Sequence, residues 1–176
     1  SLEVDATTSV SATATYSDGT TSTVTPSWAS SNTGVATVSS SGTVTAVAAG
    51  TVTITGTYEG QSGSAVLTVI ATLTDDNFST AVDLWFSDES TATSTYGHIR
   101  DWDVSAVTDM SRAFFNRSSF NEDLSSWDVS SVTSVKWMFY HAESFSGNIG
   151  SWDVSSVTDV GWMFYHAYSF NGNIGS

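Results

Sequence analysis

WDVSSVTDVGWMFYHAYSFNGNIGS (residues 152–176) is the third in-register copy of a 25-residue unit. The two copies before it are WDVSAVTDMSRAFFNRSSFNEDLSS (residues 102–126) and WDVSSVTSVKWMFYHAESFSGNIGS (residues 127–151). A repeat of this length is typical of a solenoid, in which each unit buries its apolar face against its neighbours. We therefore expect stacked units over residues 102–176, with function on the faces that stacking leaves exposed.

The spacing of apolar residues within a unit favours a leucine-rich repeat. Ile149-x-x-Trp152-x-Val154 fits the core pattern of that repeat. It predicts a short parallel strand with Trp152 and Val154 pointing inward and Asp153 pointing outward on a concave face. Residues 160–167 would then cross the convex side as a short helical turn and return Met, Phe and Ala side chains to the core.

The repeated wording Trp-Asp-Val-Ser-Ser-Val-Thr-Asp resembles the BspA-like leucine-rich repeats of bacterial surface proteins, in the 25-residue variety found in surface lipoproteins. The preceding segment DNFSTAVDLWFSDESTATSTYGHIRDWDVS (residues 76–105) is similar to the N-terminal segment of the same family. Within it, the apolar spacing after Thr74-Asp75-Asp76 predicts an amphipathic helix over residues 75–87. We expect residues 74–101 to form an N-terminal cap with this helix, and residues 102–176 to form three repeats.

Residues 1–73 have the pattern of a separate β domain. Apolar residues alternate with Ser and Thr, and Asp18-Gly19, Ser41-Gly42 and Glu59-Gly60 provide turns. Short strands at this spacing predict a β-sandwich. The fold class we expect for the whole chain is mainly β: an Ig-like β-sandwich followed by a leucine-rich-repeat solenoid with an N-terminal helical cap.

The segments YSDGTTSTVTPSWASSNTGVATVSSSGTVTAVAAGTVTITGTY (residues 16–58) and SAVLTV (residues 64–69) resemble the bacterial Ig-like domain of group 2. That family normally has a first strand ahead of the segment equivalent to residues 2–5, and this strand is largely missing here. Either an upstream strand has been removed or another chain supplies it. An unpaired sheet edge invites strand addition, so the edge is also a candidate assembly site.

Charge and composition limit the classes of partner. Eighteen acidic residues and four basic ones give a formal net charge of −14. Because phosphate binding depends on Lys and Arg, we expect neither nucleic acid nor anionic membrane as a partner. The chain has no cysteine, which excludes disulfides and thiolate metal sites. It shows no membrane-span-length apolar run or signal peptide, and because it begins at Ser1, we interpret it as a processed or excised part of a longer protein.

Two sets of repeated residues are candidates for ligand binding. The first is the aspartate column, Asp103, Asp128 and Asp153. These carboxylates either accept hydrogen bonds from their own turns or bridge a Ca²⁺ ion, which prefers oxygen ligands. No other cofactor is expected.

The second candidate set is aromatic: Trp137 over Trp162 and Tyr140 over Tyr165, beside His141 over His166. Repetition alone would stack such residues, but exposed aromatic side chains also form contact surfaces for proteins and sugar rings. The two histidines lack the further clustered ligands that a metal site needs.

The sequence carries no catalytic motif, and we expect no enzymatic activity. The predicted function is that of an extracellular adhesion or binding protein on a cell or virion surface. The Ig-like domain would be a spacer, and the acidic repeat surface would contact a protein or carbohydrate on a cell surface. The alternative is a structural subunit of a surface filament, surface layer or virion appendage. Its copies would assemble through the open strand edge and an uncapped end of the solenoid.

Overall fold

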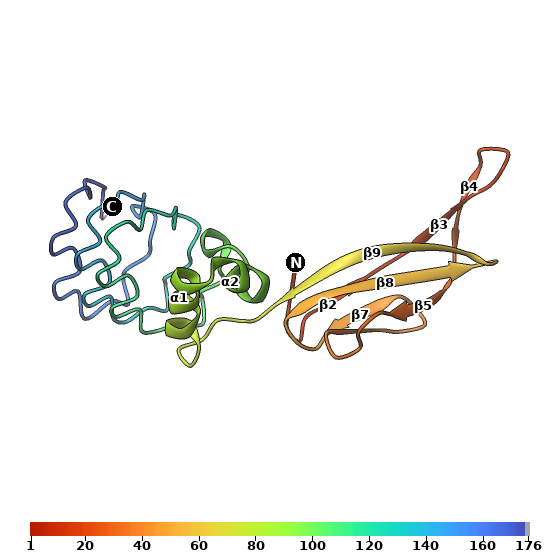
Figure 1. Cartoon of the computed structure of the whole chain (residues 1–176), viewed down its shortest axis with the longest axis horizontal. Coiled ribbons are helices and arrows are strands. Elements are labelled where there is room, and N and C mark those ends of the chain that lie inside the picture. Colours follow the sequence, from red (N-terminus) through yellow and green to blue (C-terminus); the bar gives the residue numbers. More distant parts are fainter. Residues whose placement is uncertain (175–176) are drawn as a thin grey trace. The chain divides into compact units, whose positions relative to one another are not determined.

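The computed structural model describes residues 1–174, and the chain divides into two compact units, Ser1–Thr72 and Leu73–Ser176 (Figure 1). The first unit consists of β-strands, and the second begins with helices and continues as stacked turns.

The first unit is a β-sandwich. One sheet has the order β1-β9-β8-β5, a second has the order β2-β7-β6, and β3 and β4 form a separate hairpin. The strands are β1 (Leu2–Glu3), β2 (Thr7–Ser9), β3 (Ala12–Thr15), β4 (Thr21–Val24), β5 (Ser27–Ser30), β6 (Ala36–Val38), β7 (Thr43–Ala46), β8 (Gly50–Tyr58) and β9 (Gln61–Ile70). Alternate residues of the two larger sheets meet in one core, to which Val44, Val52, Ile54 and Val69 contribute buried side chains.

A close cross-strand contact fixes the register of β5 on β8. Trp28 pairs with Gly56, and a Cβ atom at Gly56 would lie only 2.7 Å from the Trp28 ring. The absence of a side chain at Gly56 therefore lets the indole pack closely against β8.

The outer edge of β9 is largely unpaired. Strand β1 runs parallel to it but pairs only Leu2 with Val69 and Glu3 with Ile70. Within residues 1–174, no strand covers this edge between Gln61 and Thr68. Residues 2–3 themselves form a short strand, which the sequence did not predict.

The second unit begins with two helices and a short 3-10 turn: α1 (Phe78–Ser87), α2 (Glu89–Tyr96) and η1 (Ile99–Asp101). Helix α1 buries Phe78, Ala81, Val82 and Trp85. It starts three residues later than the sequence predicted, because the main-chain N–H groups of Asn77 and Phe78 bond to the Thr74 carbonyl in a preceding turn. Helix α2 is rich in Ser and Thr, and its N-terminus is capped by the Asp88 carboxylate, which accepts a hydrogen bond from the Thr91 N–H at 3.0 Å.

The repeats stack in parallel, but between residues 102 and 174 the chain forms neither the strand nor the helical turn expected of each unit. Single parallel bridges join Asp109 to Ser134 and Ser134 to Asp159. The strand predicted around each Trp is therefore wrong: the bridges lie seven residues later, and the segment after them is a series of tight turns.

A regular division of hydrogen bonds explains these turns. Going along residues 110–116, alternate N–H groups bond to the next unit, from Met110 to Ser134 at 3.0 Å and from Phe114 to Met138 at 2.8 Å. The N–H groups of Ala113 and Phe115 instead bond to carbonyls three residues back, at Met110 and Arg112, over 3.2 and 3.0 Å. The pattern repeats between residues 135–141 and 159–165. We call these inter-unit bonds the backbone ladder.

The alternation requires left-handed backbone at two positions in each unit. The φ angles are 63° at Arg112 and 59° at Asn116, and the equivalent pairs are Trp137 and His141, then Trp162 and His166. Such conformations cost a non-glycine residue about 1–2 kcal/mol, with Asn among the least penalised. Inter-unit packing must offset that cost.

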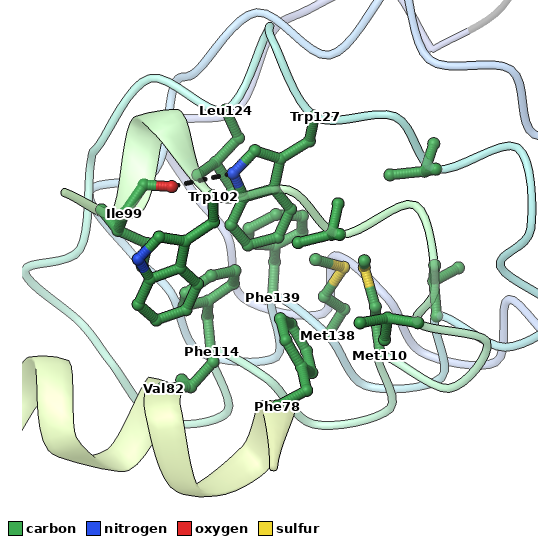
Figure 2. Close-up of a cluster of buried hydrophobic side chains, with 14 of the residues drawn as sticks. Phe78, Val82, Ile99, Trp102, Met110, Phe114, Leu124, Trp127, Met138 and Phe139 are labelled. Atoms are coloured by element: carbon green, nitrogen blue, oxygen red, sulfur yellow. Dashed lines mark hydrogen bonds between the residues drawn. The ribbon is translucent and has the colours of Figure 1, made fainter. Parts of the chain in front are cut away.

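The interior of the stack consists of columns of like side chains (Figure 2). Trp102, Trp127 and Trp152 stack with ring centroids 6.2 and 6.4 Å apart. Each buried indole also donates a hydrogen bond backwards, from Trp127 to the Ile99 carbonyl at 2.8 Å and from Trp152 to the Leu124 carbonyl at 3.0 Å. Parallel columns are formed by Phe114, Phe139 and Phe164 and by Phe120, Phe145 and Phe170. The inward direction predicted for Trp and Phe agrees with this burial.

The first repeat is completed by side chains of the preceding segment. Phe78 of α1 lies edge-on to the Trp102 and Trp127 rings, with centroids 6.4 and 6.0 Å away. Asp75 supplies the missing hydrogen-bond acceptors: its carboxylate accepts from the Thr108 N–H at 2.7 Å, the Thr108 hydroxyl at 2.6 Å and the Asp109 N–H at 3.1 Å. In later units the corresponding Thr N–H and hydroxyl groups, at Thr133 and Thr158, bond to a carbonyl of the preceding unit.

A first prediction concerns the left-handed position at Asn116, which is exposed. Asn116→Ala should be less stable than Asn116→Gly by about 1 kcal/mol, because only alanine has a Cβ that opposes this conformation. Urea unfolding followed by Trp fluorescence measures the difference. The same two substitutions at Ser119, which is exposed and has no positive φ, are the control and should not favour glycine. Equal stability of the two Asn116 variants would contradict the role of the left-handed turn.

A second prediction concerns Asp75. The Thr108 hydroxyl, followed by the Thr108 N–H, holds the pKa of the Asp75 carboxyl below its ordinary value of 3.8. A lowered folded-state pKa means that the stabilisation is present above about pH 4 and is lost as the pH falls through that pKa. Asp75→Ala should lower the free energy of unfolding by about 1 kcal/mol at neutral pH, allowing for solvent screening of this exposed group. It should also flatten the acid limb of the stability curve.

Equilibrium unfolding between pH 2 and pH 7 measures both effects. Asp76→Asn is the matched control, because the neighbouring Asp76 carboxylate is exposed and makes no hydrogen bond to residues 1–174. Equal losses in the two variants would show that net charge, and not the Asp75 contacts, carries the stabilisation.

Candidate functional site

The aspartate column lies on the surface, and each member is held by its own turn. Asp103, Asp128 and Asp153 accept hydrogen bonds from the N–H groups two residues later, at 3.0, 3.1 and 3.0 Å respectively. The pKa of Asp128 lies below its ordinary value chiefly because the Ser130 hydroxyl donates to it, although the Asp153 charge opposes the shift. The Ser155 hydroxyl likewise lowers the pKa of Asp153. These contacts favour the ionised form of the Asp128 and Asp153 carboxylates.

The structure brings Asp103 and Asp128 together with Asp101 around a shallow hollow of about 360 Å³. Over residues 1–174, however, no three His, Asp or Glu side chains gather closely enough to hold a metal ion. Calcium binding by the aspartate column therefore has no support beyond the repetition of the carboxylates.

The outward aromatic residues form a continuous stack on the ladder segments. Phe115, Tyr140 and Tyr165 lie face to face, with centroids 4.9 and 5.0 Å apart. Beside them His141 stacks on His166 at 4.4 Å, and the His166 ring bonds to the Tyr168 hydroxyl. Tyr140 and Tyr165 are therefore brought together as the sequence predicted.

Trp137 and Trp162 do not stack on each other, which corrects the sequence-based expectation. Trp137 is covered by cations: the Arg112 guanidinium carbon lies 4.4 Å from its ring centroid, and the Lys136 ammonium nitrogen lies 4.8 Å away. Trp162 instead meets Tyr165 edge-on at 5.0 Å and remains 61% exposed. We call Phe115, Trp137, Tyr140, Trp162 and Tyr165 the outer aromatic surface.

Sequence reasoning missed Arg112, Lys136 and Phe115. Phe115 holds the position of Tyr140 in the repeat, so alignment of the three units would have placed it on this surface. The cation contacts had no such signal, because Arg112 and Lys136 come from different positions of different units. Lys136 is further held by Asp159 at 3.2 Å.

A second exposed feature is the face of the third unit that no later unit covers within the described residues. Val160 and Ile174 are 62% and 59% exposed there. With Trp152, Val157 and Met163 they line an apolar hollow of about 520 Å³, which Trp162 and Tyr165 of the outer aromatic surface also border. In the earlier units the corresponding valine side chains are buried.

Of the helices in residues 1–174, none combines the length and apolarity needed to cross a bilayer. The same residues contain no buried polar or charged side chain of the kind that lines many catalytic clefts.

Comparisons with known proteins match both units. Residues 80–176 match a family described as "Mycoplasma protein of unknown function, DUF285". Residues 1–69 match the "Bacterial Ig-like domain (group 2)". One solved structure, "Crystal structure of EHEC O157:H7 intimin mutant", is 42% identical over 25% of this chain and 25% of that one, with a TM-score of 0.24. The chain thus spans a quarter of that protein, and a TM-score this low carries no argument. No curated protein matches.

The two tryptophans give a direct test of the contacts described here. Trp137→Ala should lower the stability of the repeats by about 1–2 kcal/mol, because two cation–aromatic contacts and the packing of a half-buried ring are lost. Trp162→Ala should change stability by less than about 0.5 kcal/mol. Both positions have left-handed backbone, so the conformational cost of alanine is matched. Denaturant unfolding of the two variants measures the loss of stability in each. A larger loss in Trp162→Ala than in Trp137→Ala would contradict the described environments.

Proposed function

Because the chain belongs to the family described as "Mycoplasma protein of unknown function, DUF285", we propose its function from its exposed surfaces. It is part of a non-enzymatic, surface-displayed binding protein located outside the cell. The Ig-like unit is a spacer, and the repeat unit contacts a protein or glycan on a cell surface. The observation that supports this most is the outer aromatic surface, where Phe115, Tyr140 and Tyr165 form a continuous stack of outward rings.

These outward rings are more than the stack requires. The interior already has continuous columns of Trp and Phe, and the backbone ladder joins the units independently of the outward side chains. Exposing large apolar rings is unfavourable in water, and aromatic residues are enriched where proteins bind partners. Tyr and Trp combine a broad apolar face with a polar group, which suits recognition of either a protein or a sugar ring.

The finer assignments of the repeats are part of the same proposal. The assignment to BspA-like leucine-rich repeats is supported by the repeated 25-residue motif and by the parallel stacking of the units. A Ca²⁺ ion bridging Asp103, Asp128 and Asp153 is supported only by their alignment, since each carboxylate already accepts a hydrogen bond from its own turn. Binding measurements on the protein should therefore be made both with calcium and with a chelator.

Self-assembly into a filament, surface layer or virion appendage is the second candidate. Two observations favour it: the unpaired edge of β9 and the apolar hollow at the third unit. Strand addition or stacking at these places would join copies of the chain. Sedimentation at increasing concentration separates the candidates, because a monomer favours the binding protein and ordered oligomers favour the subunit.

The test of the binding function is an array of glycans and extracellular proteins probed with the labelled chain. The double variant Trp162→Ala/Tyr165→Ala should bind its partner at least about 10-fold more weakly, because central aromatic residues carry most of the energy of such contacts. The matched control is Tyr16→Ala/Val66→Ala, which removes two exposed apolar side chains from the Ig-like unit. If the array yields no partner, or if both variants lose binding equally, the proposal is wrong.

A further inference from the structure

Cationic side chains of the chain itself pack on the face of the outward Trp137 ring. Trp137 has two cations on it, with the Arg112 guanidinium carbon at 4.4 Å and the Lys136 ammonium nitrogen at 4.8 Å from the ring centroid. Cations are attracted to the negative face of an aromatic ring, and indole binds them best. Half of the chain's four basic residues are thus placed on one ring.

Trp162 occupies the same place in the next unit but has lost both cations. The residue equivalent to Lys136 is Gly161, and the residue equivalent to Arg112 is Trp137 itself. Accordingly, no Lys or Arg among residues 1–174 lies over the Trp162 ring, although its side chain leaves the backbone with nearly the same φ, 59° against 55° at Trp137. Trp162 is 61% exposed and, with Tyr165, borders the apolar hollow of the third unit.

From this comparison we propose that the indole face of Trp162 binds an Arg or Lys side chain of a partner protein. The inference rests on the proposed binding function and narrows its partner to a basic protein surface. Tyr165, edge-on to Trp162 at 5.0 Å, forms a second wall of the site.

The charge of the chain fits a basic partner. A formal net charge of −14 attracts cationic surfaces over long range and repels acidic ones. The local charges agree, because Lys136 is neutralised by Asp159 at 3.2 Å and Glu143 lies beside His141 at 3.8 Å. Long-range attraction brings the partner to the surface, and the Trp162 ring then selects the cation that packs on it.

The experiment follows the seven Trp side-chain N–H signals of the ¹⁵N-labelled chain by NMR. The probe is N-acetyl-arginine amide, and its control is N-acetyl-citrulline amide, which has nearly the same shape and no charge. The signal that disappears in Trp162→Phe identifies Trp162. This signal should shift with the arginine probe and much less with the citrulline probe, while the signals of buried Trp127 and Trp152 should not move.

A tri-arginine peptide gives the affinity, measured by calorimetry at physiological salt. Trp162→Ala should weaken binding about 3- to 10-fold and Trp162→Phe by less, because phenylalanine keeps part of the cation attraction. Val66→Ala, in the Ig-like unit, should leave the affinity unchanged. Equal binding by wild type and Trp162→Ala would mean that only net charge attracts the peptide, and the inference would be wrong.

Two further outcomes would also overturn the inference. A Trp162 signal that shifts with methyl glucoside but not with the arginine probe indicates a glycan partner, in which case the broader binding function stands. A Trp162 signal that moves with protein concentration alone indicates contact between copies of the chain. Failure of the binding function itself is recognised separately, by an array on which the chain finds no partner.

Discussion

The second unit depends on how its main-chain N–H groups are shared between neighbours. In residues 110–116 every other N–H group bonds to the next unit. The N–H groups between them form hydrogen bonds within local turns. A strand would direct its hydrogen bonds outward to neighbouring strands, and a helix would keep them all within the segment. This segment alternates between hydrogen bonds to the next unit and hydrogen bonds within itself. The alternation determines the directions of its side chains.

The directions of the side chains follow from this division of hydrogen bonds. Residues on the inner side of the ladder segment, such as Met138 and Phe139, are buried in columns, and residues at the left-handed positions, such as Trp137 and His141, point outward. The outer aromatic surface is therefore positioned by the backbone. A ring that projects from a rigid turn loses little freedom on binding, which favours its use as a contact.

The same need to pair each N–H group with an acceptor explains the cap. The first repeat has no preceding unit to accept its N–H groups, and Asp75 supplies carboxylate oxygens in place of those carbonyls. The indole of Trp102 likewise donates to the Gly97 carbonyl at 2.9 Å, within the capping segment, whereas later Trp side chains donate to the preceding repeat. The cap thus reproduces the polar as well as the apolar contacts of a repeat.

The period of the sequence was enough to predict stacking, the inward Trp and Phe columns, the Tyr140–Tyr165 contact and a β-sandwich in the first unit. It could not reveal the local backbone, because apolar spacing says which residues are buried and not how N–H groups are divided. Left-handed backbone at Trp137 has no sequence signal, since glycine is the usual mark of such positions. The roles of Asp75 and Arg112 depend on contacts 33 and 25 residues away in sequence, beyond the reach of local patterns.

The backbone ladder has a direction, because each unit donates its alternate N–H groups to the carbonyls of the unit that follows. The third unit therefore presents four N–H groups, from Val160, Trp162, Phe164 and His166, that find no acceptor among residues 1–174. A second copy related by two-fold symmetry would place donors against donors across this face. Lipid tails would also leave them unpaired. Carbonyl oxygens at the spacing of the backbone ladder, such as those that each unit offers to the unit before it, would accept all four N–H groups.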